Sequence, residues 1–144
     1  MSELISEGDN KISASQVERE RLLTAITLRI RQSLDLDSII NQSVQEVRLF
    51  LQTNRVLVYR FEPDWSGLMV AESVVAPYQA VIGSKIKDPC LTEKHIKKYQ
   101  QGGIRVIENV ETARLPECYK DLLASFEVKA NLVVPIIAEE KLWG

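Results

Sequence analysis

The stretch RVLVYRFEPDWSGLMVAESVV, residues 55–75, decides the fold that this chain adopts. Residues 55–61 and 68–75 are rich in the β-branched and aromatic side chains that strands favour. Between them, PDWSG at residues 63–67 carries the proline, aspartate and glycine that suit a tight turn. Two strand patterns joined by such a turn predict an antiparallel β-hairpin.

Two helices are predicted before the hairpin, over residues 16–34 and from about residue 38 to residue 51, because apolar residues there recur every three or four positions. These residues are Leu22, Leu23, Ile26, Ile30 and Leu34, and then Ile40, Val44, Val47 and Leu51. Leu34-Asp35-Leu36-Asp37 breaks the period and offers aspartates as N-caps. Residues 1–15 are polar and have too little apolar surface to order themselves, so we expect a flexible N-terminal lead-in.

Smaller elements are predicted after the hairpin. They are a connection over 77–87, a helix over 92–101 that ends at Gly102-Gly103, a brief strand over 104–107, a helix from Pro116 to about Phe126, and a strand over 130–138. Pro135 places that strand at an edge or a bulge. Glu139-Glu140 would form the turn that leads into a last strand, which begins at Lys141. The order predicts an α+β fold with an antiparallel sheet flanked by helices.

The composition excludes several classes of protein. The chain has 144 residues, of which 45% are hydrophobic, and a net charge of −2, which suits one folded domain with no basic field for nucleic acid or anionic lipid. The sequence has no signal peptide and no apolar run of membrane-spanning length, so we expect a cytoplasmic protein without membrane insertion. In that reducing compartment we expect Cys90 and Cys118 to be thiols rather than a structural disulfide.

Those two cysteines are the candidate reactive groups. Each stands where a loop is predicted to turn into a helix, a place where thiolates gain reactivity. They could attach one ligand, exchange electrons, or be buried without a function, and the last is common for cysteine. Motifs for phosphate binding, nucleophilic hydrolysis or glycoside cleavage are missing, so we do not expect an enzyme, and the single histidine, His95, has no predicted metal partners.

Four blocks together resemble the GAF domain of the cyanobacteriochromes, the bilin photoreceptors related to phytochromes. They are residues 55–74, Asp88-Pro89-Cys90-Leu91, Leu115-Pro116-Glu117-Cys118-Tyr119, and KANLVVPIIAEEKLWG at residues 129–144. The resemblance covers about residues 36–144 and is closest to the two-cysteine subgroup, whose signature is Asp-x-Cys-Phe. It implies a GAF domain over residues 35–144 that is C-terminally incomplete, because such a domain continues with the rest of the last strand and a terminal helix.

The resemblance also implies a function for each site residue. Cys118 would attach a linear tetrapyrrole, phycocyanobilin or its isomer phycoviolobilin, through a thioether. Cys90 would add reversibly to the bridge between rings B and C, and Asp88 would contact pyrrole nitrogens. Light would drive Z/E isomerisation for sensory signal transduction. The partners implied are a signalling output domain, such as a histidine kinase or a cyclic-dinucleotide enzyme, outside this chain, and a second copy paired through the N-terminal helix.

Two residues depart from the family pattern. Tyr119 stands where much of the family has histidine, so it supplies an aromatic face but no imidazolium, and Leu91 replaces the signature phenylalanine. Simpler interpretations stay open. Asp88 could be a turn acid, Tyr119 a half-buried aromatic residue, and His95 a residue of a solvated helix face, or a partner of bilin propionates together with Lys94, Lys97 and Lys98.

Two alternative functions also stay open. The first is a GAF module that binds a small ligand or dimerises without a bilin. The second is a thiol-dependent enzyme like the methionine sulfoxide reductases that use a GAF fold, in which one cysteine attacks the sulfoxide and the other resolves the product.

Overall fold

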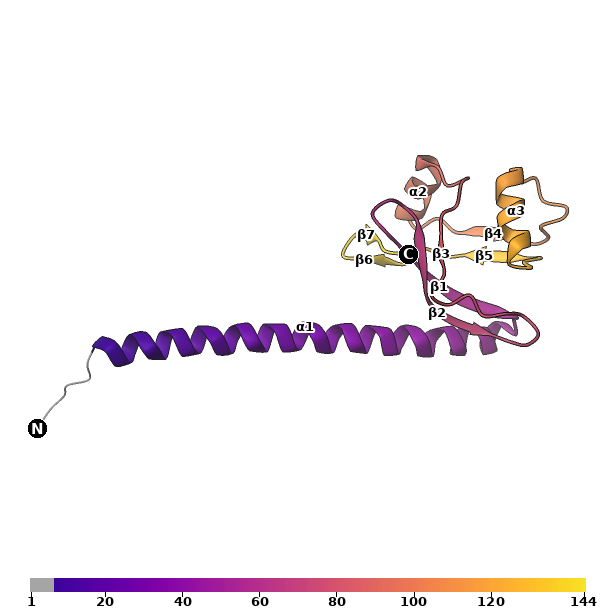
Figure 1. The fold of residues 1–144 in the computed structure, drawn as a ribbon. Coiled ribbons are helices and arrows are strands. Elements are labelled where there is room, and N and C mark those ends of the chain that lie inside the picture. Colours follow the sequence, from indigo (N-terminus) through magenta and orange to yellow (C-terminus); the bar gives the residue numbers. More distant parts are fainter. Residues whose placement is uncertain (1–6) are drawn as a thin grey trace, which may run out of the picture. The chain divides into compact units, whose positions relative to one another are not determined.

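The structure is a computed structural model that describes residues 7–144 (Figure 1), with the backbone alone at residues 7–13 and 33. The helices are α1 (Glu7–Leu51), α2 (Glu93–Gln100) and α3 (Glu117–Ser125). The strands are β1 (Arg55–Phe61), β2 (Gly67–Val74), β3 (Lys85–Ile86), β4 (Arg105–Ile107), β5 (Asn131–Val133), β6 (Ile137–Ala138) and β7 (Lys141–Leu142). The chain divides into two compact units, residues 1–40 and residues 41–144.

One helix replaces the two that were predicted before the hairpin. Helix α1 continues through Leu34-Asp35-Leu36-Asp37, so the expected break there is wrong. An aspartate inside a helix costs only a few tenths of a kcal/mol, and this segment has no proline or glycine to interrupt the backbone. The helix begins at Glu7, within the expected lead-in, and residues 1–6 lie outside the described residues.

The hairpin is confirmed. Strands β1 and β2 pair antiparallel from Arg55 opposite Val74 to Phe61 opposite Gly67, with an irregularity between Val58 and Tyr59. Strand β3, which the sequence did not predict, adds to β2 and gives the order β1-β2-β3. Its two residues lie within the segment that was interpreted as a connection, and two residues are too few to show an alternating pattern.

Two further antiparallel pairs form separate two-stranded sheets, β4 with β5 and β6 with β7. The strand predicted over residues 130–138 is split, because Pro135 has no N–H to donate to a ladder. The turn between β6 and β7 is formed by Glu139 and Glu140, which both have positive φ, at 51° and 64°. These helices and antiparallel strands confirm the predicted α+β class.

The short helices pack through a few buried side chains. Helix α2 buries Ile96 and Tyr99, and helix α3 buries Tyr119 and Leu123. The core cluster consists of Ile107, Val110, Tyr119 and Leu123, against which Cys90 and Leu122 pack. Gly102, at φ +82°, follows the end of α2 as predicted. The loop that carries Cys90 is therefore held against the helix that carries Cys118.

Candidate functional site

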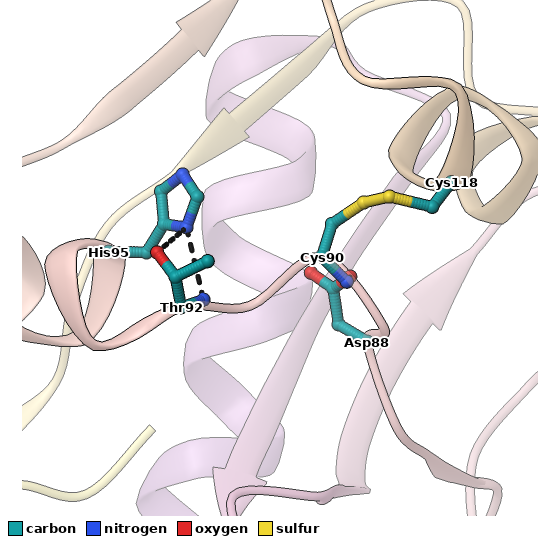
Figure 2. The surroundings of a disulfide bond; sticks show 5 residues. All are labelled: Asp88, Cys90, Thr92, His95 and Cys118. Carbon is teal, nitrogen blue, oxygen red and sulfur yellow. Dashed lines mark hydrogen bonds between the residues drawn. A yellow bond between two sulfur atoms is a disulfide. The ribbon is translucent and has the colours of Figure 1, made fainter.

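The two cysteines form a disulfide, which corrects the expectation that they are free thiols. Figure 2 shows the Cys90 and Cys118 sulfur atoms bonded to each other. The two Cα atoms are 6.0 Å apart. That separation lies within the range a disulfide spans, about 4.4–6.8 Å. The earlier expectation came from the compartment alone, which says nothing about how close two residues 28 positions apart come in the fold. Cys118 does lie in the first turn of α3, as predicted.

Asp88 caps the turn that carries Cys90. Its carboxylate oxygen Oδ1 accepts a hydrogen bond of 2.8 Å from the Cys90 backbone N–H, and its carbonyl accepts a second from the Leu91 N–H at 3.3 Å. This is the turn-acid arrangement that was left open. The same residue also lines the large cavity described below, so Asp88 belongs both to the loop and to the cavity wall.

His95 belongs to the N-terminal cap of α2. Its Nδ1 atom accepts a hydrogen bond from the Thr92 backbone N–H at 3.2 Å and lies 2.9 Å from the Thr92 hydroxyl oxygen (Figure 2). The ring is half-buried and lines two cavities, so both interpretations, a residue of a solvated helix face and a partner of bilin propionates, stay open. Among residues 7–144, no group of three or more His, Cys, Asp or Glu residues is arranged to hold a metal ion.

A cavity of about 640 Å³ lies within residues 41–144. Its size falls within the range usual for ligand sites, roughly 300–1,000 Å³. The polar and charged side chains on its wall include Asp88, His95, Arg105, Tyr59 and Tyr119, and apolar residues such as Met69, Leu91 and Leu122 supply much of the rest. Asp88 and Leu91 flank Cys90, and Tyr119 follows Cys118, so the disulfide lies beside this wall.

Tyr119 and Arg105 form a stacked pair on the wall. The Arg105 guanidinium carbon lies 4.0 Å from the centre of the Tyr119 ring, a cation–π contact. The Tyr119 hydroxyl oxygen accepts a hydrogen bond from the Asn131 side-chain amide at 3.3 Å. Burial raises the pKa of Tyr119, although the nearby Arg105 charge opposes the rise. Arg105 therefore adds a permanent positive charge beside Tyr119, whose own side chain carries none.

Arg105 is the site residue that sequence analysis missed. A signal was present, because Arg105 and Ile107 lie two apart on strand β4 and therefore share a face, and Ile107 is buried. An arginine on the inward face of a strand needs a partner or a ligand. Arg105 also lines a second cavity of about 790 Å³ beside α2, together with the basic residues Lys94, Lys97, Lys98 and His95.

Tyr59 is held at the cavity wall by close packing and one hydrogen bond. Its hydroxyl donates to the Ile86 carbonyl at 3.1 Å, and its ring lies against Gly67, where any side chain would collide with it. Burial raises the pKa of Tyr59 from 10.0 to about 12, and the Asp88 and Asp64 carboxylates add to the rise. The folded protein thus favours the neutral phenol.

We expect alkaline destabilisation that depends on Tyr59. In the unfolded chain its phenol ionises near pH 10, while the folded form keeps the proton until about pH 12, so stability is full below pH 10 and falls as the pH rises between these values. The Tyr59→Phe variant should lose less stability over this interval. Urea midpoints measured across the pH range for both proteins provide the check, and equal declines would contradict the assignment.

The fold and the cavity define an α+β domain with a ligand-sized site, and comparison with known proteins identifies its class. The family model of the GAF domain matches residues 35–144. The chain therefore belongs to the GAF domain family. It is 36% identical over 141 residues to a putative methyl-accepting chemotaxis protein of Synechocystis sp., a match that covers 98% of this chain and 14% of that protein.

Solved structures agree with this assignment. The blue-light absorbing form of the Thermosynechococcus elongatus PixJ GAF domain is 35% identical with a TM-score of 0.72, over 76% of this chain and 66% of that one. A phycocyanobilin-bound GAF domain from a cyanobacterial phytochrome is 32% identical with a TM-score of 0.70, over 87% of this chain and 75% of that one. The predicted likeness to cyanobacteriochrome GAF domains is confirmed. Within residues 7–144, no helix combines the length and apolar character that crossing a membrane requires.

Proposed function

We propose that this GAF domain is a photosensor that binds a linear tetrapyrrole covalently in the cavity of about 640 Å³. The observation that carries the proposal is the meeting of Cys90 and Cys118 beside a cavity wall that also bears Asp88, His95 and Tyr119. The match to a GAF domain with bound phycocyanobilin supports the proposal. When bound, the pigment would supply light absorption and Z/E isomerisation.

The wall residues fit such a pigment chemically. Cys118 would attach it through a thioether, and Cys90 would be the second, reversible attachment site. The Asp88 carboxylate would accept hydrogen bonds from pyrrole N–H groups, a favourable pairing when the pigment is protonated. The Arg105 guanidinium, stacked on Tyr119, would face the pigment from the wall that they share.

The basic residues beside α2 suit the carboxylates of a bilin. Lys94, Lys97 and Lys98 line one cavity with His95 and Arg105, and the last two also line the cavity of about 640 Å³. Two propionate groups, one on each of the inner pyrrole rings, would be paired by cations of this kind. We propose phycocyanobilin or its isomer phycoviolobilin as the pigment.

Production of the chain together with a phycocyanobilin pathway tests the proposal. We expect a coloured protein whose pigment stays attached during denaturing electrophoresis, seen by zinc-enhanced fluorescence. Its absorption spectrum should change reversibly on illumination. A folded but colourless protein whose cysteines are reduced would contradict the proposal. The folded state is checked independently by a cooperative unfolding transition.

Signalling requires partners outside this domain. The chain spans 14% of the chemotaxis relative, so the output domain of such a receptor would lie elsewhere in a longer protein or on a partner. We also propose that α1 pairs with a second copy of this chain, because Leu22, Leu23 and Ile26 of its first unit are exposed by 63%, 61% and 46%. Sedimentation measures that pairing, because a paired particle has twice the mass of a single chain.

The disulfide favours one second candidate, a thiol-dependent sulfoxide reductase. A joined pair, Cys90 and Cys118, is what such an enzyme would hold after one turnover. Sulfoxide reduction coupled to thioredoxin and NADPH, without pigment, would support this candidate. The absence of turnover in a protein that binds pigment would remove it.

A further inference from the structure

The cysteine pair has two mutually exclusive chemical states. In the disulfide, neither sulfur is a thiol or a thiolate, because Cys90 Sγ is bonded to Cys118 Sγ. Only a free thiol or thiolate can add to a carbon–carbon double bond. Attachment of a pigment to Cys118 and closure of the disulfide therefore compete for the same sulfur atom.

The disulfide lies beside the cavity, so this competition affects the proposed ligand site. The disulfide joins the loop before α2 to the first turn of α3, and it lies beside the cavity through the neighbouring residues Asp88, Leu91 and Tyr119. Cys90 and Cys118 are only half-buried, so a small dithiol can reach the bond. Cys90 also packs against the core cluster.

We propose that the Cys90–Cys118 disulfide is a redox lock on pigment attachment, an inference that rests on the proposed function. A dithiol reductant opens the lock. It transfers two electrons and two protons, its own two sulfurs become a disulfide, and Cys90 and Cys118 become thiols. Cys118 Sγ then forms a bond to a carbon of the pigment's ring A side chain, and the thiol proton goes to the neighbouring carbon. That addition needs no further oxidant or reductant.

After the pigment is attached, a change in redox conditions alone can neither re-form the disulfide nor release the pigment. Once Cys118 Sγ is in a thioether, Cys90 has no partner cysteine among the 144 residues, because this sequence has two cysteines. Oxidising conditions therefore block loading of new protein and leave loaded protein coloured. The fraction of coloured protein would record the redox state at the time the pigment was supplied.

The test compares one purified full chain in two redox states. One sample is oxidised until thiol alkylation detects no free cysteine, and the other is reduced with dithiothreitol and desalted without oxygen. Phycocyanobilin is added to both, and covalent pigment is followed by zinc-enhanced fluorescence after denaturing electrophoresis. We expect the oxidised sample to load at least about tenfold more slowly, because its sulfurs are not nucleophiles. Equal loading rates would overturn the lock.

Two variants separate this inference from the proposed function. Cys90→Ser cannot form the disulfide, so it should load equally fast with and without reduction, and a remaining dependence on reductant would overturn the lock. Cys90→Ala provides the same test if the serine variant folds poorly. If neither the reduced chain nor these variants take up pigment, the proposed function fails and the inference fails with it. If all forms load regardless of redox state, the proposed function stands and the lock alone is wrong.

Discussion

Cys118→Ala, produced with phycocyanobilin under reducing conditions, should retain no pigment through denaturing electrophoresis. Cys118 lies in the first turn of α3 beside Tyr119, a residue of the cavity wall, so the fold would present its sulfur to ring A. Alanine removes the nucleophile and keeps the Cβ atom of α3. We expect a complete loss of zinc-enhanced fluorescence from the denatured band, whereas pigment held without a covalent bond would remain visible only in the native protein.

Cys90→Ala is the matched control, because it removes the other sulfur of the same pair. This variant should keep the attached pigment, and any blue absorption should move to the red, since no second thiol interrupts the conjugated system. Absorption before and after acid denaturation distinguishes the two effects. If the first variant kept its pigment and the second lost it, the two cysteines would have been assigned in the wrong order.

Glu72→Gln should lower the free energy of unfolding by about 3 kcal/mol, the cost of leaving a buried charge without its partner. The Glu72 side chain is 2% exposed, and its Oε2 atom lies 3.1 Å from Arg55 Nε without the alignment of a hydrogen bond. Its Oε1 atom accepts hydrogen bonds from the Val81 and Ile82 backbone N–H groups. Arg55 also donates to the Phe126 and Gln79 carbonyls, so this pair connects the hairpin to two distant segments.

Glu62→Gln is the control for this loss of charge. Glu62 pairs with Arg60 at the same distance, 3.1 Å, but the two side chains are 30% and 41% exposed. Water screens such a pair, so we expect a change of less than about 1 kcal/mol. Urea unfolding of both variants measures the difference, and equal losses would show that the burial of Glu72 contributes nothing to its importance.

The hairpin and the short helices were predictable, because their information is local. The turn at residues 63–67 and the stop at Gly102 depend on backbone preferences that single residues impose. The continuity of α1 was not predictable in the same way. Asp35 and Asp37 suit an N-cap as well as a helix interior, and the small difference in free energy between these states is decided by the rest of the chain.

The same distinction between local and long-range information applies to the site. The neighbourhood of Cys90, Asp88 and Tyr119 was identified from short sequence blocks, and the fold does bring these residues together. The disulfide and the Arg105 stack were missed, since each depends on the distance between segments far apart in sequence. A residue type shows what a side chain can do, but only the fold shows which partner it meets.

The cap of α2 fixes the tautomer of His95. Because Nδ1 accepts from the Thr92 backbone N–H, the neutral imidazole must carry its proton on Nε2. The ring nitrogen that the cap leaves unused, Nε2, is then a hydrogen-bond donor. A carboxylate placed beside Nε2 would find a hydrogen-bond donor, so the neutral His95 could hold an acidic ligand without first taking up a proton.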